Sequence, residues 1–235
     1  MSESIVLDIR NLKSHFFTAK GEVPAVDGVT IQVPPGKIIG IVGESGCGKS
    51  MTAMSVMGLL RYPGRVVEGS ITLDGRDITH LSPRELAKVR GNEISMIFQD
   101  SGAMINPIRK IGSQYVEYIR AHKNISKKDA FGMAVEMLEK MRLPDGKRIM
   151  ESYPFELSGG MCQRVGIAMA MTFQPKLLLA DEPTGNLDNN NAWEIMKLME
   201  EINNNGTTVV VVTHNLEHGG SRYHLSVCSI GICRS

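Results

Sequence analysis

A short apolar run that leads into a glycine-rich loop constrains the fold of this chain more than any other feature. The run covers residues 38–42, and its unbroken hydrophobicity is typical of a strand that is buried on both faces. The loop consists of Gly43, Glu44, Ser45, Gly46, Cys47, Gly48, Lys49 and Ser50. A segment of helical character follows at residues 50–60. This order of strand, loop and helix predicts a parallel α/β sheet with the loop between a buried strand and a helix.

The loop matches the phosphate-loop pattern, in which glycine and four further residues precede Gly-Lys-Ser. Glycines let backbone N–H groups turn inward around phosphate oxygens, and the following helix directs its positive end at the same anion. In such a loop Lys49 reaches the terminal phosphates, and the Ser50 hydroxyl ligates Mg²⁺. A chance match is expected in on the order of 1% of chains of this length. We therefore predict that the loop binds a nucleoside triphosphate.

A second apolar run ends in two acidic residues. Residues 177–180 are apolar, and Asp181 and Glu182 follow them directly. In phosphate-loop proteins an Asp at the tip of such a strand holds Mg²⁺. Glu182 should point in a different direction, because side chains alternate along a strand, and could polarise a water for attack on the γ-phosphate. Solvated acids at a strand end are also common, but the loop upstream favours the functional interpretation.

Strand-like and helix-like segments alternate along the rest of the chain. Asp74-Gly75 predicts a tight turn after a strand, and Ser82 with Glu85 predicts a capping box at a helix start. Residues 111–150 have a helical period, which predicts an insertion between two halves of the sheet. Strands are expected at residues 5–9, 29–33, 70–73, 177–181 and 208–212, and further helices at 160–173 and 191–203.

Composition narrows the function classes. The 235 residues carry a formal net charge of +1, which argues against a general nucleic-acid binder. The sequence contains no apolar stretch of the roughly 20 residues that a spanning helix needs, and its start does not resemble a secretory signal. Without such a signal, the irregularly spaced cysteines do not predict a disulfide framework. We therefore expect a cytosolic protein with reduced thiols.

Four further motifs follow in a fixed order. They are Met96-Ile97-Phe98-Gln99-Asp100, Leu157-Ser158-Gly159-Gly160-Met161-Cys162-Gln163-Arg164, Gly185-Asn186-Leu187-Asp188 and Thr213-His214. With the phosphate loop and the two acids, they resemble the Q-loop, signature motif, D-loop and switch histidine of the ATPase subunit of an ATP-binding cassette (ABC) transporter. The resemblance covers residues 5–216.

This resemblance implies a fold and its division. The expected fold is an α/β phosphate-loop NTPase core with an antiparallel β subdomain and an inserted helical subdomain. We expect a single ATPase domain over residues 5–235. Its catalytic core would cover residues 5–98 and 166–216, and its helical subdomain residues 99–165.

The resemblance also implies a role for each motif. The loop and Met51 would bind ATP, with Phe16 stacked on adenine, although the adjacent Phe17 could take that place or both rings could be core. Gln99 would sense Mg²⁺ and the attacking water, and His214 would hold the γ-phosphate. In the family two subunits pack head to tail, so the helix start at Ser158, Gly159 and Gly160 would bind the ATP of the other subunit. Asp188 would belong to the D-loop.

Within the family, several stretches resemble importers of peptides or nickel complexes. They are residues 43–53, 69–75 and 153–156, together with Phe98-Gln99-Asp100 and Asn106-Pro107. The expected partners are a second ATPase subunit (identical or different), transmembrane permease subunits and an extracytoplasmic substrate-binding protein. The subunit would lie on the cytoplasmic face of the cell membrane. The alternatives are a soluble ABC-type ATPase not coupled to transport, and an inactive truncated nucleotide-binding subunit.

The last residues depart from the family pattern. Residues 217–235 match none of the apolar strand, glycine turn or long extension that such subunits continue with. We therefore expect an atypical tail produced by truncation or a frame shift. Cys228 and Cys233 with His218 and His224 are too irregularly spaced to predict a metal site.

Overall fold

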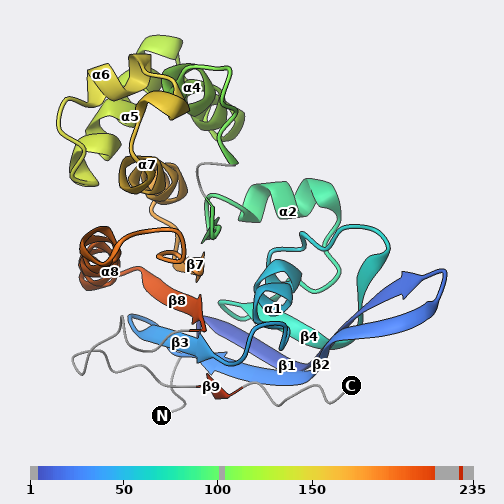
Figure 1. Ribbon diagram of the computed structural model, residues 1–235. Helices are drawn as coiled ribbons and strands as arrows, with labels where there is room; N and C mark the ends of the chain where they lie inside the picture. Colours follow the sequence, from blue (N-terminus) through green and yellow to red (C-terminus); the bar gives the residue numbers. More distant parts are fainter. Residues whose placement is uncertain (1–4, 101–103, 215–227, 230–235) are drawn as a thin grey trace.

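The computed structural model describes residues 5–100, 104–214 and 228–229 (Figure 1). Its strands are β1 (Leu7–Thr18), β2 (Gly21–Val33), β3 (Ile38–Val42), β4 (Gly64–Leu73), β5 (Arg76–Asp77), β6 (Ile94–Ile97), β7 (Leu177–Asp181), β8 (Thr208–Thr213) and β9 (Cys228–Ser229). Its helices are α1 (Lys49–Val56), α2 (Pro83–Val89), α4 (Ile111–His122), α5 (Lys127–Lys140), α6 (Gly146–Glu151), the 3₁₀ turn η1 (Pro154–Glu156), α7 (Gly159–Met171) and α8 (Asn189–Asn204).

A parallel sheet forms the centre of the molecule. Its strand order is β6-β7-β8-β3-β9, and every neighbouring pair is parallel. Side chains of β7 alternate between two apolar clusters: Leu178 and Ala180 face one, and Leu177 and Leu179 face the other. Burial on both faces explains why this strand is apolar throughout rather than alternating.

An antiparallel sheet with the order β2-β1-β4-β5 packs against α1. Asp74 and Gly75 both have positive φ values, 49° and 79°, as a two-residue hairpin turn between β4 and β5 requires. A buried hydrogen bond of 2.8 Å between the hydroxyls of Ser14 and Ser55 joins β1 to α1. Because α1 also contacts β7 and β8, it holds the two sheets together.

The helices α4, α5 and α6 come between β6 and β7 in the sequence, and they gather at one end of the molecule (Figure 1). The α7 helix lies between them and the parallel sheet and contacts both α5 and β6. The predicted apolar face is confirmed: Ala134, Met137, Leu138 and Met141 are all buried. One apolar cluster therefore continues from these helices to the sheet.

Most predicted elements are confirmed, with differences in extent. The capping box of Ser82 and Glu85 is present at the start of α2. The first helix ends at Val56 rather than at residue 60, because Gly58 adopts a left-handed φ of 60° soon after it. The first strand continues to Thr18 through irregular pairing with β2. In the part of the chain that the structure describes, no helix is both long and apolar enough to cross a bilayer.

The tail is described only at β9, which pairs in parallel with β3. The sequence pattern did not predict this strand. The expectation of an altered tail otherwise falls on residues outside the described ranges.

Candidate functional site

An open cavity of about 500 Å³ lies where the glycine-rich loop meets the carboxyl ends of the central strands. The carboxyl end of a parallel sheet is the usual place for a ligand site in folds of this class. The residues that line it are Val23, Pro24, Ala25, Ser45, Gly46, Gly48, Lys49, Ser50, Met51, Gln99, Glu182 and His214. Most of the predicted ATP-binding and catalytic residues thus meet around one space.

The loop conformation depends on glycine at Gly48. Its φ is 90°, and a Cβ atom there would lie 2.4 Å from the carbonyl oxygen of Ala25 on β2. Gly46 also has a positive φ, 82°, and open space around it. These glycines let the backbone curve closely, as a loop that surrounds an anion requires.

Lys49 lies at the start of α1 and is almost completely buried. Its ammonium group donates hydrogen bonds to the carbonyl oxygens of Gly43 and Glu44, at 2.8 and 2.7 Å. The positive charge is therefore held over the loop, next to the N-terminus of α1. Both features attract an anion to the same point.

Ser50 and Asp181 lie 131 positions apart in the sequence, and the fold brings them together. The Ser50 hydroxyl donates a 2.8 Å hydrogen bond to Oδ1 of Asp181, the last residue of β7. Burial raises the pKa of Asp181, with a further contribution from the charge of Glu182, while Ser50 and Lys49 oppose the rise. A hydroxyl and a carboxylate side by side are oxygen ligands of the kind that Mg²⁺ takes, so the pair fits this ion.

Glu182 follows β7 and faces His214. Its Oε1 lies 2.7 Å from Nδ1 of His214, and its Oε2 accepts a 3.3 Å hydrogen bond from the hydroxyl of Thr213. The Glu182 side chain is 12% exposed, while that of His214 is 57% exposed. Asp181 faces Ser50 and Glu182 faces His214, so the two side chains point in different directions as predicted. The cause is not the alternation of side chains along a strand. Glu182 lies beyond the strand, in a left-handed conformation with φ of 46°.

Gln99 lines the same cavity from the segment after β6. Its side chain also lies against Gly185, where a Cβ atom would be 3.3 Å from Nε2 of Gln99. Gln99 therefore contacts both the cavity and the segment that leads to Asp188.

The signature residues form a separate group that does not line this cavity. Ser158 caps α7 by accepting a 3.3 Å hydrogen bond from the backbone N–H of Met161. Gly160 packs against the side chain of Asn191, which donates a 2.7 Å hydrogen bond to Asp188. Gly159 lies near Leu187. The structure thus brings the signature residues and Asp188 together, and none of them lines the cavity at the loop of their own chain.

Phe16 and Cys47 have surroundings that the sequence did not indicate. The ring of Phe16 covers Gly64, and Phe16 is not among the residues that line the cavity. Its antiparallel partner Val23 does line it. The Sγ of Cys47 lies beside Gly43 and 3.7 Å from Nζ of Lys49.

Sequence reasoning missed the contribution of β2, and it gave Thr213 no role of its own within the Thr213-His214 motif. Val23, Pro24 and Ala25 line the cavity, and Thr213 donates to Glu182. No motif marks the β2 residues, because their position depends on how β2 packs against α1. Thr213 directly precedes the predicted His214, and this position in the sequence was its only link to the site.

Comparison with known proteins agrees with this geometry. The sequence profile described as ABC transporter matches residues 26–185, which is more than half of the chain. The chain belongs to the ABC transporter family. This match confirms the family predicted from the motif order.

Two curated relatives of this ABC chain are named as oligopeptide transport ATP-binding proteins. The oligopeptide transport ATP-binding protein AppD of Bacillus subtilis is 43% identical over 215 residues, which cover 91% of this chain and 66% of AppD. OppD of Escherichia coli, also named an oligopeptide transport ATP-binding protein, is 45% identical over 212 residues, or 90% of this chain and 63% of OppD. The chain thus spans slightly less than two thirds of the length of these relatives.

Solved ABC structures confirm the predicted fold class. The dimeric bacterial ABC transporter cassette MJ0796 has a TM-score of 0.79 and 29% identity, covering 90% of this chain and 89% of that one. A dimeric post-hydrolysis state of MJ0796, bound to ADP and Pi, has a TM-score of 0.78 and the same identity.

Proposed function

We propose that this chain binds ATP with Mg²⁺, hydrolyses it, and serves as the ATP-binding subunit of a peptide importer. The observation that carries the proposal is the convergence of Lys49, Ser50, Glu182 and His214 on one cavity, with Asp181 hydrogen-bonded to Ser50. They come from the start of α1, from the end of β7 and from the residue that follows β8, and each has the chemistry that phosphoryl transfer needs at that point.

The loop and Lys49 would hold the phosphates of ATP. In this role the Lys49 ammonium exchanges carbonyl acceptors for phosphate oxygens, which bind a cation more strongly because they carry charge. Ser50 and Asp181 would hold Mg²⁺, which supplies charge compensation on the phosphates when bound. The β2 residues would border the remainder of the nucleotide, and adenine stacking by Phe16 stays a prediction.

Glu182 would accept the proton of the attacking water. Its carboxylate is fixed on one side by His214 and on the other by Thr213, so its direction is set before a water arrives. An oriented carboxylate of this kind typically contributes about 10²–10⁴-fold to the rate. Gln99 and His214 would orient the water and the γ-phosphate from the two sides of the same cavity.

The signature residues would act on the ATP of a second subunit. Ser158, Gly159 and Gly160 stand at the start of α7 and do not line the cavity at the loop of their own chain. A helix start offers free N–H groups to an anion, so a head-to-tail pair of subunits would place each one opposite a loop. The dimeric state of the cassette MJ0796 supports the pairing of two subunits.

The transported substrate is inferred from the relatives. AppD and OppD carry oligopeptide transport in their names, which favours peptides over nickel complexes. The subunit would act at the cytoplasmic face of a membrane with permease subunits and an extracytoplasmic substrate-binding protein. We propose no nucleic-acid partner.

ATPase measurements on the purified chain with Mg²⁺ test the core of this proposal. We expect turnover that falls at least about 100-fold in Glu182→Gln, with ATP binding retained, because only the proton acceptor is lost. Glu139→Gln changes an exposed acid on α5 and serves as the matched control with unchanged turnover. Wild-type turnover in Glu182→Gln would overturn the catalytic assignment. Binding without turnover in the wild type would favour a regulatory subunit.

A further inference from the structure

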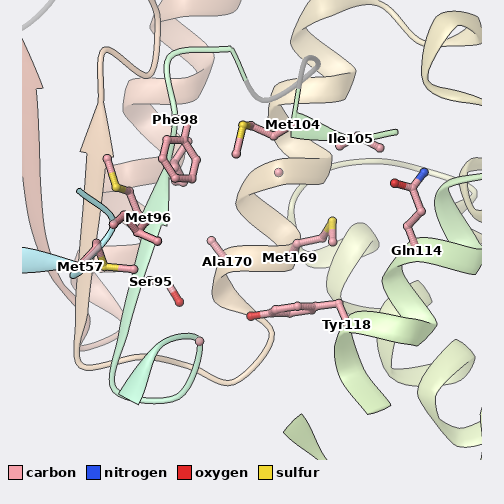
Figure 2. Close-up of a pocket in the computed structure, with 14 residues that line it drawn as sticks. Met57, Ser95, Met96, Phe98, Met104, Ile105, Gln114, Tyr118, Met169 and Ala170 are labelled. Atoms are coloured by element: carbon pink, nitrogen blue, oxygen red, sulfur yellow. The ribbon is translucent and has the colours of Figure 1, made fainter. Parts of the chain in front are cut away.

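An open groove of about 880 Å³ runs along α4, where α5 and α6 pack against this helix. It shares no lining residue with the nucleotide cavity. It is also separate from the apolar cavity beside β6 and α7 that Figure 2 shows, which Gln114 and Tyr118 line from a different side of α4. The groove is therefore a surface that the proposed ATPase chemistry does not use.

The floor of the groove is apolar and comes from three helices. Val116 of α4, Phe131 of α5 and Met150 of α6 line it. Val116 and Phe131 are half-buried, and Met150 is almost completely buried. An apolar side chain that lies on this floor is stabilised, because the contact removes apolar surface from water.

Basic side chains surround this floor. The charged residues that line the groove are four cations and two acids: Arg109, Lys110, Arg120 and Lys127, with Glu117 and Glu151. Glu117 is already paired with Arg109 at 2.6 Å. No carboxylate in the described part of the chain forms an ion pair with Lys110, Arg120 or Lys127. The groove thus carries an excess of positive charge that the described residues do not neutralise.

Two of these cations stand where a positive charge does not stabilise the fold. Lys110 is the N-cap of α4, and Lys127 is the first residue of α5. A helix start has a partial positive charge of its own, so a cation there is unfavourable and an acid is favourable. The third cation, Arg120, donates a 3.1 Å hydrogen bond from Nε to the carbonyl oxygen of Ile125, which helps to fix its guanidinium group beside the groove.

We propose that this groove is a docking surface for an acidic segment of a partner protein, in which carboxylates flank an apolar side chain. The carboxylates pair with Lys110, Arg120 and Lys127, and the apolar side chain covers the floor. A basic segment does not fit, because like charges across an interface repel each other.

A chain segment fits the groove better than a membrane surface does. The four cations are exposed, whereas Val116 and Phe131 on the floor are half-buried. A flat layer of anionic lipid contacts the exposed cations and leaves the floor uncovered. It also brings lipid phosphates against Glu117 and Glu151, which line the same groove.

The probe for this surface is the peptide Asp-Glu-Leu-Phe-Glu-Asp with both ends blocked. It is titrated calorimetrically into the full chain without nucleotide, so the result does not depend on the proposed ATPase activity. We expect saturable binding that weakens at least about fivefold between about 0.1 M and 1 M salt, because the Debye length falls from about 10 to 3 Å. The same peptide with Lys for every acid should not bind. With Ser for Leu and Phe, it should bind about three- to tenfold more weakly.

NMR of the chain labelled with ¹³C at its methionine methyl groups locates the bound peptide. The signal of Met150, which lines the groove, should shift as the peptide is added. The signals of Met196 and Met199 on α8 should not shift. Saturable binding that leaves Met150 unchanged would place the peptide elsewhere and overturn the proposal.

A double charge reversal tests the cations. Lys110→Glu combined with Lys127→Glu should weaken peptide binding about tenfold. Both positions are helix starts that favour an acid, so this variant should fold, which its thermal unfolding checks. Lys20→Glu combined with Lys37→Glu reverses two exposed lysines outside the groove and should leave the affinity unchanged.

Three results would overturn the proposal. The first is the absence of saturable binding of the acidic peptide, and the second is equal binding of the acidic and lysine peptides. The third is an unchanged affinity in the folded Lys110→Glu, Lys127→Glu variant. Sedimentation with vesicles of phosphatidylserine and phosphatidylcholine covers the membrane alternative. If the chain sediments with them, the double variant does not, and the peptide fails to bind, the groove contacts lipid rather than a protein segment.

Discussion

Gly48 affects both the stability of the fold and the proposed binding of ATP. Alanine there must adopt a left-handed φ, at a cost of about 1–2 kcal/mol, and its Cβ would lie 2.4 Å from the backbone of Ala25. We expect Gly48→Ala to lower the free energy of unfolding by at least about 1–2 kcal/mol in urea titrations. It should also lose ATP binding, measured by calorimetry.

Gly132 on α5 provides the matched control for that substitution. A Cβ atom at Gly132 meets open space, so Gly132→Ala should raise the free energy of unfolding by about 0.5–1 kcal/mol. Equal effects of the two substitutions would mean that the close approach of Gly48 to β2 does not matter.

Cys47 offers a chemical probe of the same loop. Its Sγ lies 3.7 Å from the Lys49 ammonium, so an alkyl group there would displace Lys49 from the loop. Loss of a charge-assisted hydrogen bond worth about 1.5–3 kcal/mol predicts a fall in ATP affinity of about tenfold or more. Affinity is measured before and after treatment with N-ethylmaleimide.

The control for this experiment is Cys47→Ser, whose ATP affinity should not respond to the reagent. Cys162 should react slowly, because it is buried and burial raises its thiol pKa. If Cys47→Ser is as sensitive as the wild type, the effect comes from another cysteine.

The residues of the candidate site differ in how visible they are in the sequence. Lys49, Ser50 and Asp181 belong to local motifs whose chemistry can be read without a structure. Val23 and Ala25 belong to no motif, because they reach the cavity only through the packing of β2 on α1.

At the scale of elements, α7 begins at Ser158, whose hydroxyl caps the helix and is also proposed to bind phosphate. Ser158 accepts the N–H of Met161, and Ser126 accepts the N–H of Asp129 in the same way at the start of α5. Replacing either serine with alanine should cost about 1 kcal/mol in the free energy of unfolding. We expect only Ser158→Ala to reduce ATP turnover as well, because only that hydroxyl is proposed to bind phosphate. Equal turnover in the two variants would reduce Ser158 to a helix cap.

Element types followed from the sequence more readily than element ends. The buried strand β7 has the predicted bounds, because an apolar run followed by two acids leaves little choice. The end of α1 was misplaced because the sequence beyond Val56 stays apolar, while the backbone turns at Gly58. The strand β9 could not be predicted, since its two residues carry no strand pattern of their own.

At the scale of the whole molecule, the separation of the loop from the signature predicts complementation. Lys49→Ala keeps an intact Ser158, and Ser158→Ala keeps an intact loop. In a head-to-tail pair of the two variants, one of the two sites has both parts. We expect ATP turnover of the mixture to exceed the sum of the separate variants, as measured at equal total concentration. Strict additivity would argue that each chain works alone.

The position of β3 in the sheet has a consequence for synthesis in the cell. Within the described ranges its neighbours are β8 and β9, which lie at the far end of the chain. A nascent chain leaving the ribosome therefore carries an apolar, unpaired strand until Thr208–Thr213 has been translated. The phosphate loop follows β3 directly. We therefore expect the loop to lack an ordered conformation that ATP can bind until β8 has been translated. ATP should accordingly stabilise the chain only after β8 has been translated.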